Sequence, residues 1–276
     1  MAKHFYDRPG KVSLDAISTE PPRGAAKDAA VQRVAALGEE LFELQDLLWG
    51  ARTHALLIVL QGRDAAGKDG AIKTVAGALN PRGTVVTSFG VPTPEELGHD
   101  FLWRVHRHAP RKGEVALFNR SHYEDVLVVR VHELAPRSLW AERYGHINDF
   151  EELLAEHDTI VLKFFLHIDR DEQKKRLVER ENDPRKAWKL NVRDWQERDY
   201  WDAYTRANEE AIGRCASKRA PWIVVPANAK WYRNLVVAET VVETLRPYRK
   251  VWRARLDALE AEGRKELAAY RRAKKR

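Results

Sequence analysis

The sequence predicts an α/β protein whose parallel sheet is covered by helices on both faces. Short apolar runs rich in Val and Ile occupy residues 55–61, 84–89, 114–118, 159–168 and 222–226. Stretches with the apolar spacing or the high charge of helices lie between them. Strands that are apolar throughout and alternate with helices are typical of parallel sheets buried on both faces.

Composition supports a folded domain and argues against a membrane span. The chain has 276 residues, of which 44% are hydrophobic, with 48 Lys and Arg against 41 Asp and Glu and a net charge of +7. Its apolar runs are far shorter than the roughly 18–20 residues of a membrane helix. No apolar stretch typical of a secretory signal follows Met1, so we expect a cytoplasmic protein. Cys215 is the one cysteine, which excludes an internal disulfide and a thiolate metal cluster.

Helical patterns surround these strands. Residues 1–27, punctuated by Pro and Gly, predict an extended arm that lies on the domain. Residues 28–50 predict a helix with one apolar face, formed by Val31, Val34, Leu37, Leu41, Leu44 and Leu48. Further helices are expected at 171–181 and 199–215, and a long one from Leu235 ends in the basic stretch 264–276. We therefore expect a main domain at 28–250 between an arm at 1–27 and a basic helical tail at 251–276.

The loop after the first strand has the spacing of a phosphate-binding loop. Gly62 and Gly67 are five positions apart, Lys68 follows, and a helix can begin at Ala71. Glycines let backbone N–H groups surround a phosphate at a helix N-terminus, and the lysine reaches its outer oxygens. The predicted phosphate-binding residues here are Gly62, Arg63, Ala65, Ala66, Gly67, Lys68, Asp69 and Gly70. The alternative is a tight strand-to-helix turn with an incidental lysine.

Two acidic residues distinguish this loop from that of an ordinary nucleoside triphosphatase. Asp69 follows Lys68 where Ser or Thr is usual, and Asp64 lies inside the loop. Carboxylates repel phosphates unless a divalent cation lies between them. The loop therefore predicts Mg²⁺ or Mn²⁺ bound by Asp64, with Asp69 as a further ligand. The two carboxylates also argue against an ordinary ATP site.

Polar residues follow the third strand, where ligands bind in folds of this kind. Asn119 stands where phosphoryl-transfer enzymes usually carry an Asp that contacts the metal through water. Arg120 is expected to contact phosphate rather than form a structural ion pair. Asp125 is a possible contributor to the metal site, whereas His122 is more often a packing residue than a catalyst.

A basic run after the fourth strand predicts a lid over residues 169–195. It contains Lys174, Lys175, Arg176, Arg180, Arg185, Lys186, Lys189 and Arg193. A solvated helix face explains Lys174 and Lys175. Arg176 and Arg180 share a helix face, and an arginine lid would bring two anions together and exclude water.

Several separated motifs together resemble the polyphosphate kinase 2 family across most of residues 28–250. They are the loop 62–70, the turn 118–125, Asp183-Pro184, Trp188-Lys189-Leu190 and the stretch 222–234. The sequence from Asn119 to Asp125 is similar to the class III branch, whereas classes I and II typically have Asp-Arg-Ser followed by Trp-Tyr-Asn. Asn119 departs from the family's strand-end Asp.

This resemblance implies a three-layer, thymidylate-kinase-like P-loop fold with inorganic polyphosphate as phosphoryl donor. The acceptors implied are AMP and ADP, with GMP and GDP as further candidates. Lys68 would hold phosphate, Asp64 would bind metal, and Arg120 would contact the transferring group. The resemblance implies roles for five further residues by position: Asp125, Arg176, Arg180, Asp194 and Lys230. Asp125 and Arg176 are catalytic candidates, and Arg180 and Lys230 are expected to bind phosphate. Association into a homo-oligomer is also implied.

Two other functions stay open on the sequence. An ATP-dependent kinase of a nucleotide or small metabolite would use a similar loop. A protein that binds polyanions or nucleic acid without turnover is suggested by the basic tail 271–276, although no recognised nucleic-acid motif is present. A helical stretch at 99–112, rich in Arg and His, is expected either to line a track for a polyanion or to be a polar surface helix.

Overall fold

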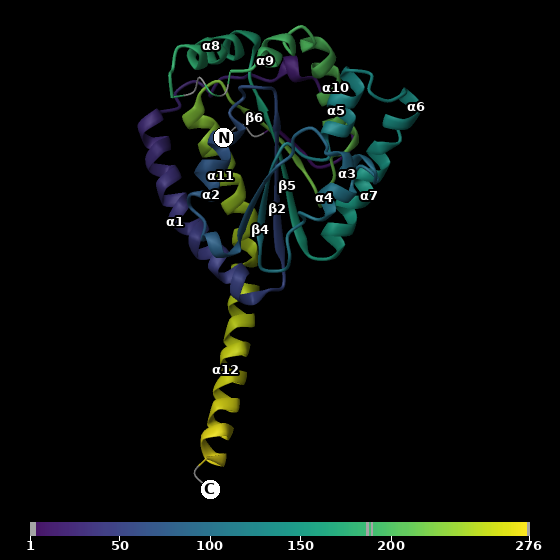
Figure 1. The fold of residues 1–276 in the computed structure, drawn as a ribbon. Coiled ribbons are helices and arrows are strands. Elements are labelled where there is room, and N and C mark those ends of the chain that lie inside the picture. The colour runs from purple at the N-terminus through teal and green to yellow at the C-terminus, as the bar shows by residue number, and fades with distance from the viewer. Residues whose placement is uncertain (1–3, 186–187, 189, 275–276) are drawn as a thin grey trace.

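A six-stranded sheet forms the centre of the computed structural model, which describes residues 4–185, 188 and 190–274 (Figure 1). The strand order is β1-β6-β5-β2-β4-β3. The strands are β1 (His4–Tyr6), β2 (Ala55–Gly62), β3 (Thr84–Ser88), β4 (Val115–Asn119), β5 (Thr159–His167) and β6 (Trp222–Pro226). All neighbours pair in parallel except β1, which runs antiparallel to β6 at one edge.

Helices cover both faces of the sheet, which confirms the predicted α/β fold. One face packs against α1 (Lys27–Ala51), α2 (Lys68–Ala76) and α11 (Lys230–Leu245). The other packs against α5 (Glu124–Val131), α7 (Arg143–Glu156) and α10 (Trp201–Arg214). The lid region holds α8 (Arg170–Glu181) and α9 (Val192–Gln196), and short helices are α3 (Pro94–Leu97), α4 (Trp103–His106) and α6 (Arg137–Trp140).

The apolar runs are explained by burial on both faces. In β2, Leu56 and Ile58 belong to the core beside α1 and α11, whereas Leu57 and Val59 belong to the core beside α5 and α7. Alternate residues of a strand point to opposite faces. An uninterrupted apolar sequence is therefore what a central strand between two helical layers requires.

A buried ion pair accounts for the one lysine inside the predicted strand at 159–168. Lys163 of β5 is fully buried and pairs with Glu151 of α7. Its Nζ also donates to the hydroxyl of Tyr123 at 2.9 Å and to the carbonyl oxygen of Cys215 at 2.6 Å. Burial opposes ionisation of Glu151, but Lys163 and His122 hold its pKa below the ordinary value. These contacts fasten α7 and α10 to the sheet below the turn that follows β4.

The arm contributes a strand that was not predicted, β1, whose pairing with β6 is a tertiary contact that arm composition does not predict. Two local expectations were wrong. The helix after the loop begins at Lys68 instead of Ala71. Residues 99–112 are mostly turns, with helix only at α4, so an extended basic helix does not form there.

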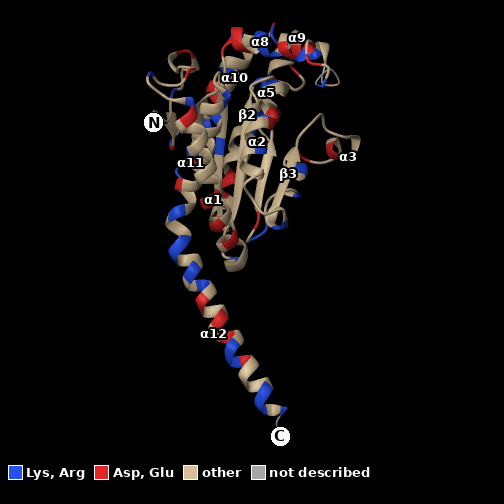
Figure 2. Cartoon of the chain, turned by 90° about the vertical axis from the view of Figure 1, so that its left-hand side faces the viewer, with Lys and Arg blue, Asp and Glu red and all other residues tan. Residues whose placement is uncertain are grey.

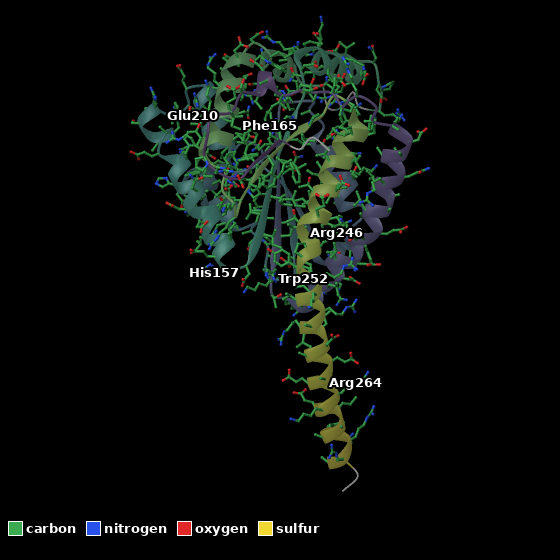
Figure 3. All side chains as sticks on the ribbon, turned by 180° about the vertical axis from the view of Figure 1, so that it is seen from behind. His157, Phe165, Glu210, Arg246, Trp252 and Arg264 are labelled. Carbon is green, nitrogen blue, oxygen red and sulfur yellow. The ribbon has the colours of Figure 1, made fainter. Side chains whose placement is uncertain are left out.

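The C-terminal helix also differs from the sequence expectation. A 3₁₀ turn at Arg246–Tyr248 contains a proline and separates α11 from α12 (Arg249–Ala273), because proline cannot donate the backbone hydrogen bond that a continuous helix needs. Trp252 is buried where α12 leaves the body, and Arg264 lies on the projecting part (Figure 3). Groups of Lys and Arg are separated by groups of Asp and Glu along this helix (Figure 2). In the described part of the chain, no helix combines the length and apolar character of a membrane span.

We predict that Lys163→Met lowers the free energy of unfolding by about 3–5 kcal/mol, because it leaves the carboxylate of Glu151 buried without its cation. Urea unfolding measures this change. The double variant Lys163→Met/Glu151→Gln removes both charges and should lose less than the single variant. A loss below about 1 kcal/mol for Lys163→Met would show that the pair does not hold the layers together.

Candidate active site

The loop between β2 and α2 has the conformation of an anion cradle. Gly62 and Gly67 have φ values of 152° and 97°, in the region that favours glycine. Lys68 is the first residue of α2, and its Nζ donates to the carbonyl oxygens of Gly62 at 2.7 Å and Arg63 at 3.2 Å. The N–H groups in the first turn of α2 have no acceptor inside the helix. The loop thus presents backbone donors and one ammonium group to a bound anion.

Lys68 is held in surroundings that disfavour its charge. Burial, and next the charge of Arg120, lower its pKa from 10.5 to about 8, although Asp64 and Glu124 act in the opposite direction. Without a bound anion, the ammonium interacts mainly with carbonyl oxygens. A phosphate in the loop would supply the negative charge that stabilises it.

The end of β4 brings a guanidinium to this loop. The backbone N–H of Arg120 donates to the carbonyl oxygen of Leu60 at 3.0 Å, and its φ is 61°. Its side chain contacts Asp64 at 2.5 Å and Glu124 at 3.4 Å. The charge of Glu124 raises the pKa of Arg120 despite burial. Arg120 therefore stays charged and neutralises the carboxylate inside the loop.

The second carboxylate of the loop also contacts the end of β4. Asn119 donates from Nδ2 to Oδ1 of Asp69 at 2.9 Å. Among the described residues, no group of three or more His, Cys, Asp or Glu side chains could hold a metal ion by itself. Mg²⁺ commonly takes one or two carboxylates and completes its shell with phosphate oxygens and water. Asp64 and Asp69 fit that role once a phosphate is bound.

A cavity of about 650 Å³ adjoins the loop on the α5 side of the sheet. Asp64 and Arg120 line its inner end. Its apolar wall includes Phe89, Val91, Leu97, Val128, Val129 and Leu134. Its cations are Arg104, Arg120, Arg143 and Arg193, and its carboxylates are Asp64, Glu124, Asp125, Asp194 and Glu197. The predicted residue Asp125 lies here and accepts from Arg143 at 3.0 Å. Burial raises the pKa of Asp125 to about 6, against the opposing charge of Arg143.

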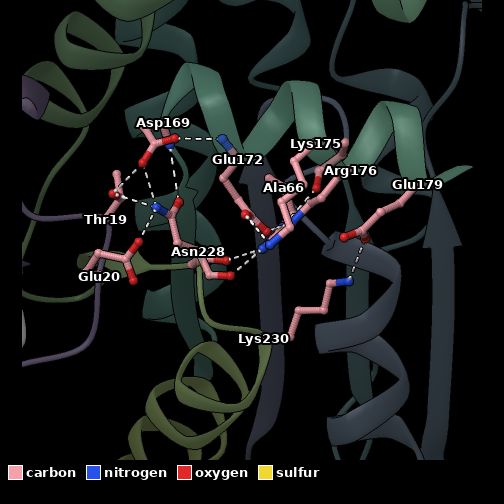
Figure 4. Close-up of polar contacts among 12 residues, drawn as sticks. Thr19, Glu20, Ala66, Asp169, Glu172, Lys175, Arg176, Glu179, Asn228 and Lys230 are labelled. Carbon is pink, nitrogen blue, oxygen red and sulfur yellow. Dashed lines mark hydrogen bonds and ion pairs between the residues drawn. The ribbon is translucent and has the colours of Figure 1, made fainter.

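Arg176 fastens two loops together at the base of the lid (Figure 4). Nη1 donates to the carbonyl oxygens of Ala65 and Ala66, each at 2.9 Å. Nη2 donates to those of Ala227 at 2.6 Å and Asn228 at 2.8 Å, and Nε donates to Glu172 at 2.7 Å. All five N–H groups are engaged. The structure gives this residue a positioning role, and its contact with a transferring phosphate stays a prediction.

The arm meets the same region. The side-chain amide of Asn228 donates to Thr19 at 3.0 Å, to Glu20 at 2.7 Å and to Asp169 at 2.6 Å (Figure 4). Asp169 is the N-cap of α8, the first lid helix. The arm therefore joins the lid base and the loop after β6 in one polar network.

Other predicted residues lie farther from the cradle. Arg180 pairs with Asp194 and joins α8 to α9. The side chain of Arg63 turns to α10, where it contacts Thr205 at 2.5 Å and stacks on the ring of Trp201. Lys230 lies in a different groove, 3.8 Å from Glu179 (Figure 4). The predicted lid residues Lys186 and Lys189, and Lys275 and Arg276 of the tail, lie outside the described residues.

Sequence reasoning missed several residues of this site. Glu124 pairs with Arg120, and Arg143 lines the cavity, as does Arg104 from the basic stretch 99–112. Arg233 of α11 lies against Gly67 and Gly70. Arg233 is within the stretch 222–234 that carries the family resemblance, but nothing in its spacing singles it out from other arginines. Its proximity to the loop depends on how α11 packs against α2.

Comparisons with known proteins agree on one family. A family model described as polyphosphate kinase 2 matches residues 24–252. An AMP/ADP-polyphosphate phosphotransferase of Meiothermus ruber is 52% identical over 219 residues, which cover 79% of this chain and 82% of the relative. An ADP-polyphosphate phosphotransferase of Rhodopseudomonas palustris is 43% identical, with 75% and 76% covered. The crystal structure of polyphosphate kinase 2 from Arthrobacter aurescens TC1 superposes with a TM-score of 0.85 at 41% identity, covering 88% of both chains.

We predict that affinity for a phosphate anion decreases above about pH 8, because the Lys68 ammonium, with its pKa of about 8, loses its proton there. The dissociation constant of tripolyphosphate, measured by calorimetry, should rise toward tenfold per pH unit above this value. Lys68→Arg is the control, since its guanidinium keeps its charge and should remove that pH dependence. A wild-type dissociation constant that is constant from pH 7 to 9.5 would contradict the assignment.

Proposed function

The chain belongs to the polyphosphate kinase 2 family, and we propose that it transfers phosphate from inorganic polyphosphate to AMP and ADP. The main support is the acidic phosphate loop: Asp64 and Asp69 are each paired by the end of β4, beside a cavity that is partly apolar and is lined by both arginines and carboxylates. The names of the similar Meiothermus and Rhodopseudomonas enzymes agree with these substrates.

The cavity beside the loop suits the nucleotide acceptor. Its apolar wall, formed by the segment after β3, by α3 and by α5 with the turn that follows it, provides surface for a base and a ribose. Arg104 and Arg143 provide charge for the phosphates. An apolar contact with the face of a purine does not distinguish adenine from guanine, so GMP and GDP belong to the same proposal.

The donor is proposed to approach from the other face of the sheet. A groove of about 530 Å³ there is lined by Lys27, Lys175 and Lys230, from α1, α8 and α11. Lys175 contacts Glu172 at 3.5 Å, and Lys230 contacts Glu179 at 3.8 Å. These partly exposed pairs are weak, and a polyanion can replace their carboxylates. Inorganic polyphosphate has charge but no base, which matches an open groove with exposed cations.

The transfer itself needs positioning and charge neutralisation rather than a strong base. An oxygen of the acceptor's terminal phosphate is already anionic and forms the new P–O bond, while the bond from the transferred phosphorus to the rest of the polyphosphate breaks. Lys68 and Arg120 would supply positive charge where the phosphate is transferred. Asp64 and Asp69 would hold Mg²⁺ or Mn²⁺, which would neutralise charge on the phosphate oxygens.

Two further parts of the proposal concern the cell and the assembly. The family resemblance supports subunit association, which light scattering of the purified protein measures. The single cysteine, Cys215, is buried, and a cytoplasmic location agrees with a chain that has no second cysteine for a disulfide.

The function is tested by combining each donor with each acceptor. Purified protein with AMP, Mg²⁺ and long-chain polyphosphate should form ADP and then ATP, and omission of the metal should stop product formation. Polyphosphate and ATP are compared as donors in parallel. Transfer from ATP without transfer from polyphosphate would instead establish an ATP-dependent kinase.

We predict that Lys68→Ala lowers the transfer rate at least about 100-fold, by analogy with the loss of a single charge-stabilising group in other enzymes. Circular dichroism should show an unchanged fold, because the glycines and Arg176 still hold the loop when the two hydrogen bonds from Lys68 to its carbonyl oxygens are lost. Lys73→Ala is the matched control, since Lys73 is exposed on the same helix. Near-normal turnover by Lys68→Ala would remove the loop from the active site.

A further inference from the structure

Arg233 places a buried guanidinium against the phosphate loop. The residue lies in the first turn of α11 and is 3% exposed. A methyl group built on Gly70 would lie 2.8 Å from its Nη2, and one built on Gly67 would clash with its Nη1. Glycine at these two positions therefore leaves room for the arginine as well as for the turn of the backbone.

No carboxylate neutralises this cation within the described ranges. Nε and Nη2 of Arg233 donate to the side-chain oxygen of the neighbouring Asn234, at 3.1 and 2.7 Å. The nearest charge is another cation, because Arg176 reaches the same side of Gly67. Burial, together with Arg176, lowers the pKa of Arg233 to about 10. A buried charge without a counterion is unfavourable, so this arrangement weakens the ligand-free protein.

The surroundings indicate what the missing counterion is. Gly67 is the N-cap of α2, where backbone N–H groups and the helix dipole favour an anion. Lys68, also buried, is beside it with only carbonyl oxygens as hydrogen-bond acceptors. A phosphate at the loop would be attracted by both side chains and by these N–H groups.

We infer that Arg233 is a donor-binding residue, whose guanidinium contacts a phosphate of the polyphosphate chain held by the loop. This inference rests on the proposed function, since it takes polyphosphate as the anion. The donor rather than the acceptor is assigned because Arg233 reaches the loop from α11, on the face of the sheet that carries the lysine groove, whereas the acceptor cavity is on the α5 side.

A purely structural arginine would behave differently. If Arg233 only held α11 against α2, its removal would destabilise the protein and leave substrate binding unchanged. If it awaits an anion, replacing it by methionine removes an uncompensated charge and keeps most of the buried volume. Replacement of buried ionic groups by well-packed apolar ones is often neutral or stabilising.

The test compares Arg233→Met with the wild type and with Arg246→Met. Arg246 is paired with Glu40 at 2.7 Å, at the end of α11 distant from the loop. We expect Arg233→Met to keep or raise the Tm of the ligand-free protein, to lose most of the Tm increase caused by tripolyphosphate, and to raise the KM for polyphosphate about tenfold or more. The KM for AMP should stay within about twofold, and Arg246→Met should change neither KM.

The outcomes that overturn the inference are distinct. A lower Tm with an unchanged KM for polyphosphate means a structural role, and a raised KM for AMP alone means that the acceptor is the ligand. Arg233→Lys, which keeps the charge, should bind tripolyphosphate better than Arg233→Met, and it replaces that variant in every comparison if the methionine protein does not fold. If the wild type binds tripolyphosphate but transfers no phosphate, the proposed function fails while the binding comparison still decides on Arg233.

Discussion

Negative charge gathered at one edge of the sheet is the constraint on which this site depends. Asp64 and Asp69 stand inside a loop built to attract phosphates, so the carboxylates and the ligand repel one another. Arg120 and Asn119 hold these two carboxylates from the end of β4. Lys68 lies buried beside them. Arg120, Asn119 and Lys68 therefore offset this repulsion from within the protein.

The sheet topology makes such an arrangement possible. β2 and β4 are parallel neighbours, and Leu60 lies opposite Asn119 in their register. The carboxyl ends of both strands therefore open at the same edge, and the loop after one strand meets the turn after the other. Arg176 adds the third connection, because it binds carbonyl oxygens of the loop after β2 and of the loop after β6. Three loops distant in sequence thus share one rigid frame.

The fold and the phosphate-binding loop could be predicted from local sequence patterns, whereas the roles of individual side chains depend on tertiary contacts. The apolar runs predicted the five parallel strands, because a strand that is buried on both faces is apolar along its whole length. The spacing of Gly62, Gly67 and Lys68 likewise predicted the loop conformation, because glycines are needed where the backbone turns between the strand and the helix. No local pattern shows that Arg176 binds carbonyl oxygens or that Arg233 lacks a carboxylate. Those facts depend on how α8 and α11 pack, and the residues that approach them are more than a hundred positions away in the chain.

The polar network around Asn228 has a consequence for the way the protein is made. Thr19 and Asn228 are 209 positions apart, and at a synthesis rate of about 5–20 residues per second the second follows the first by roughly 10–40 s. During that interval the nascent arm has neither β6 nor the loop after it as a partner. The lid base can therefore assemble only after Asn228 has been synthesised. A chain released before β6 is made would leave β1 without its partner strand, as an unpaired edge open to aggregation.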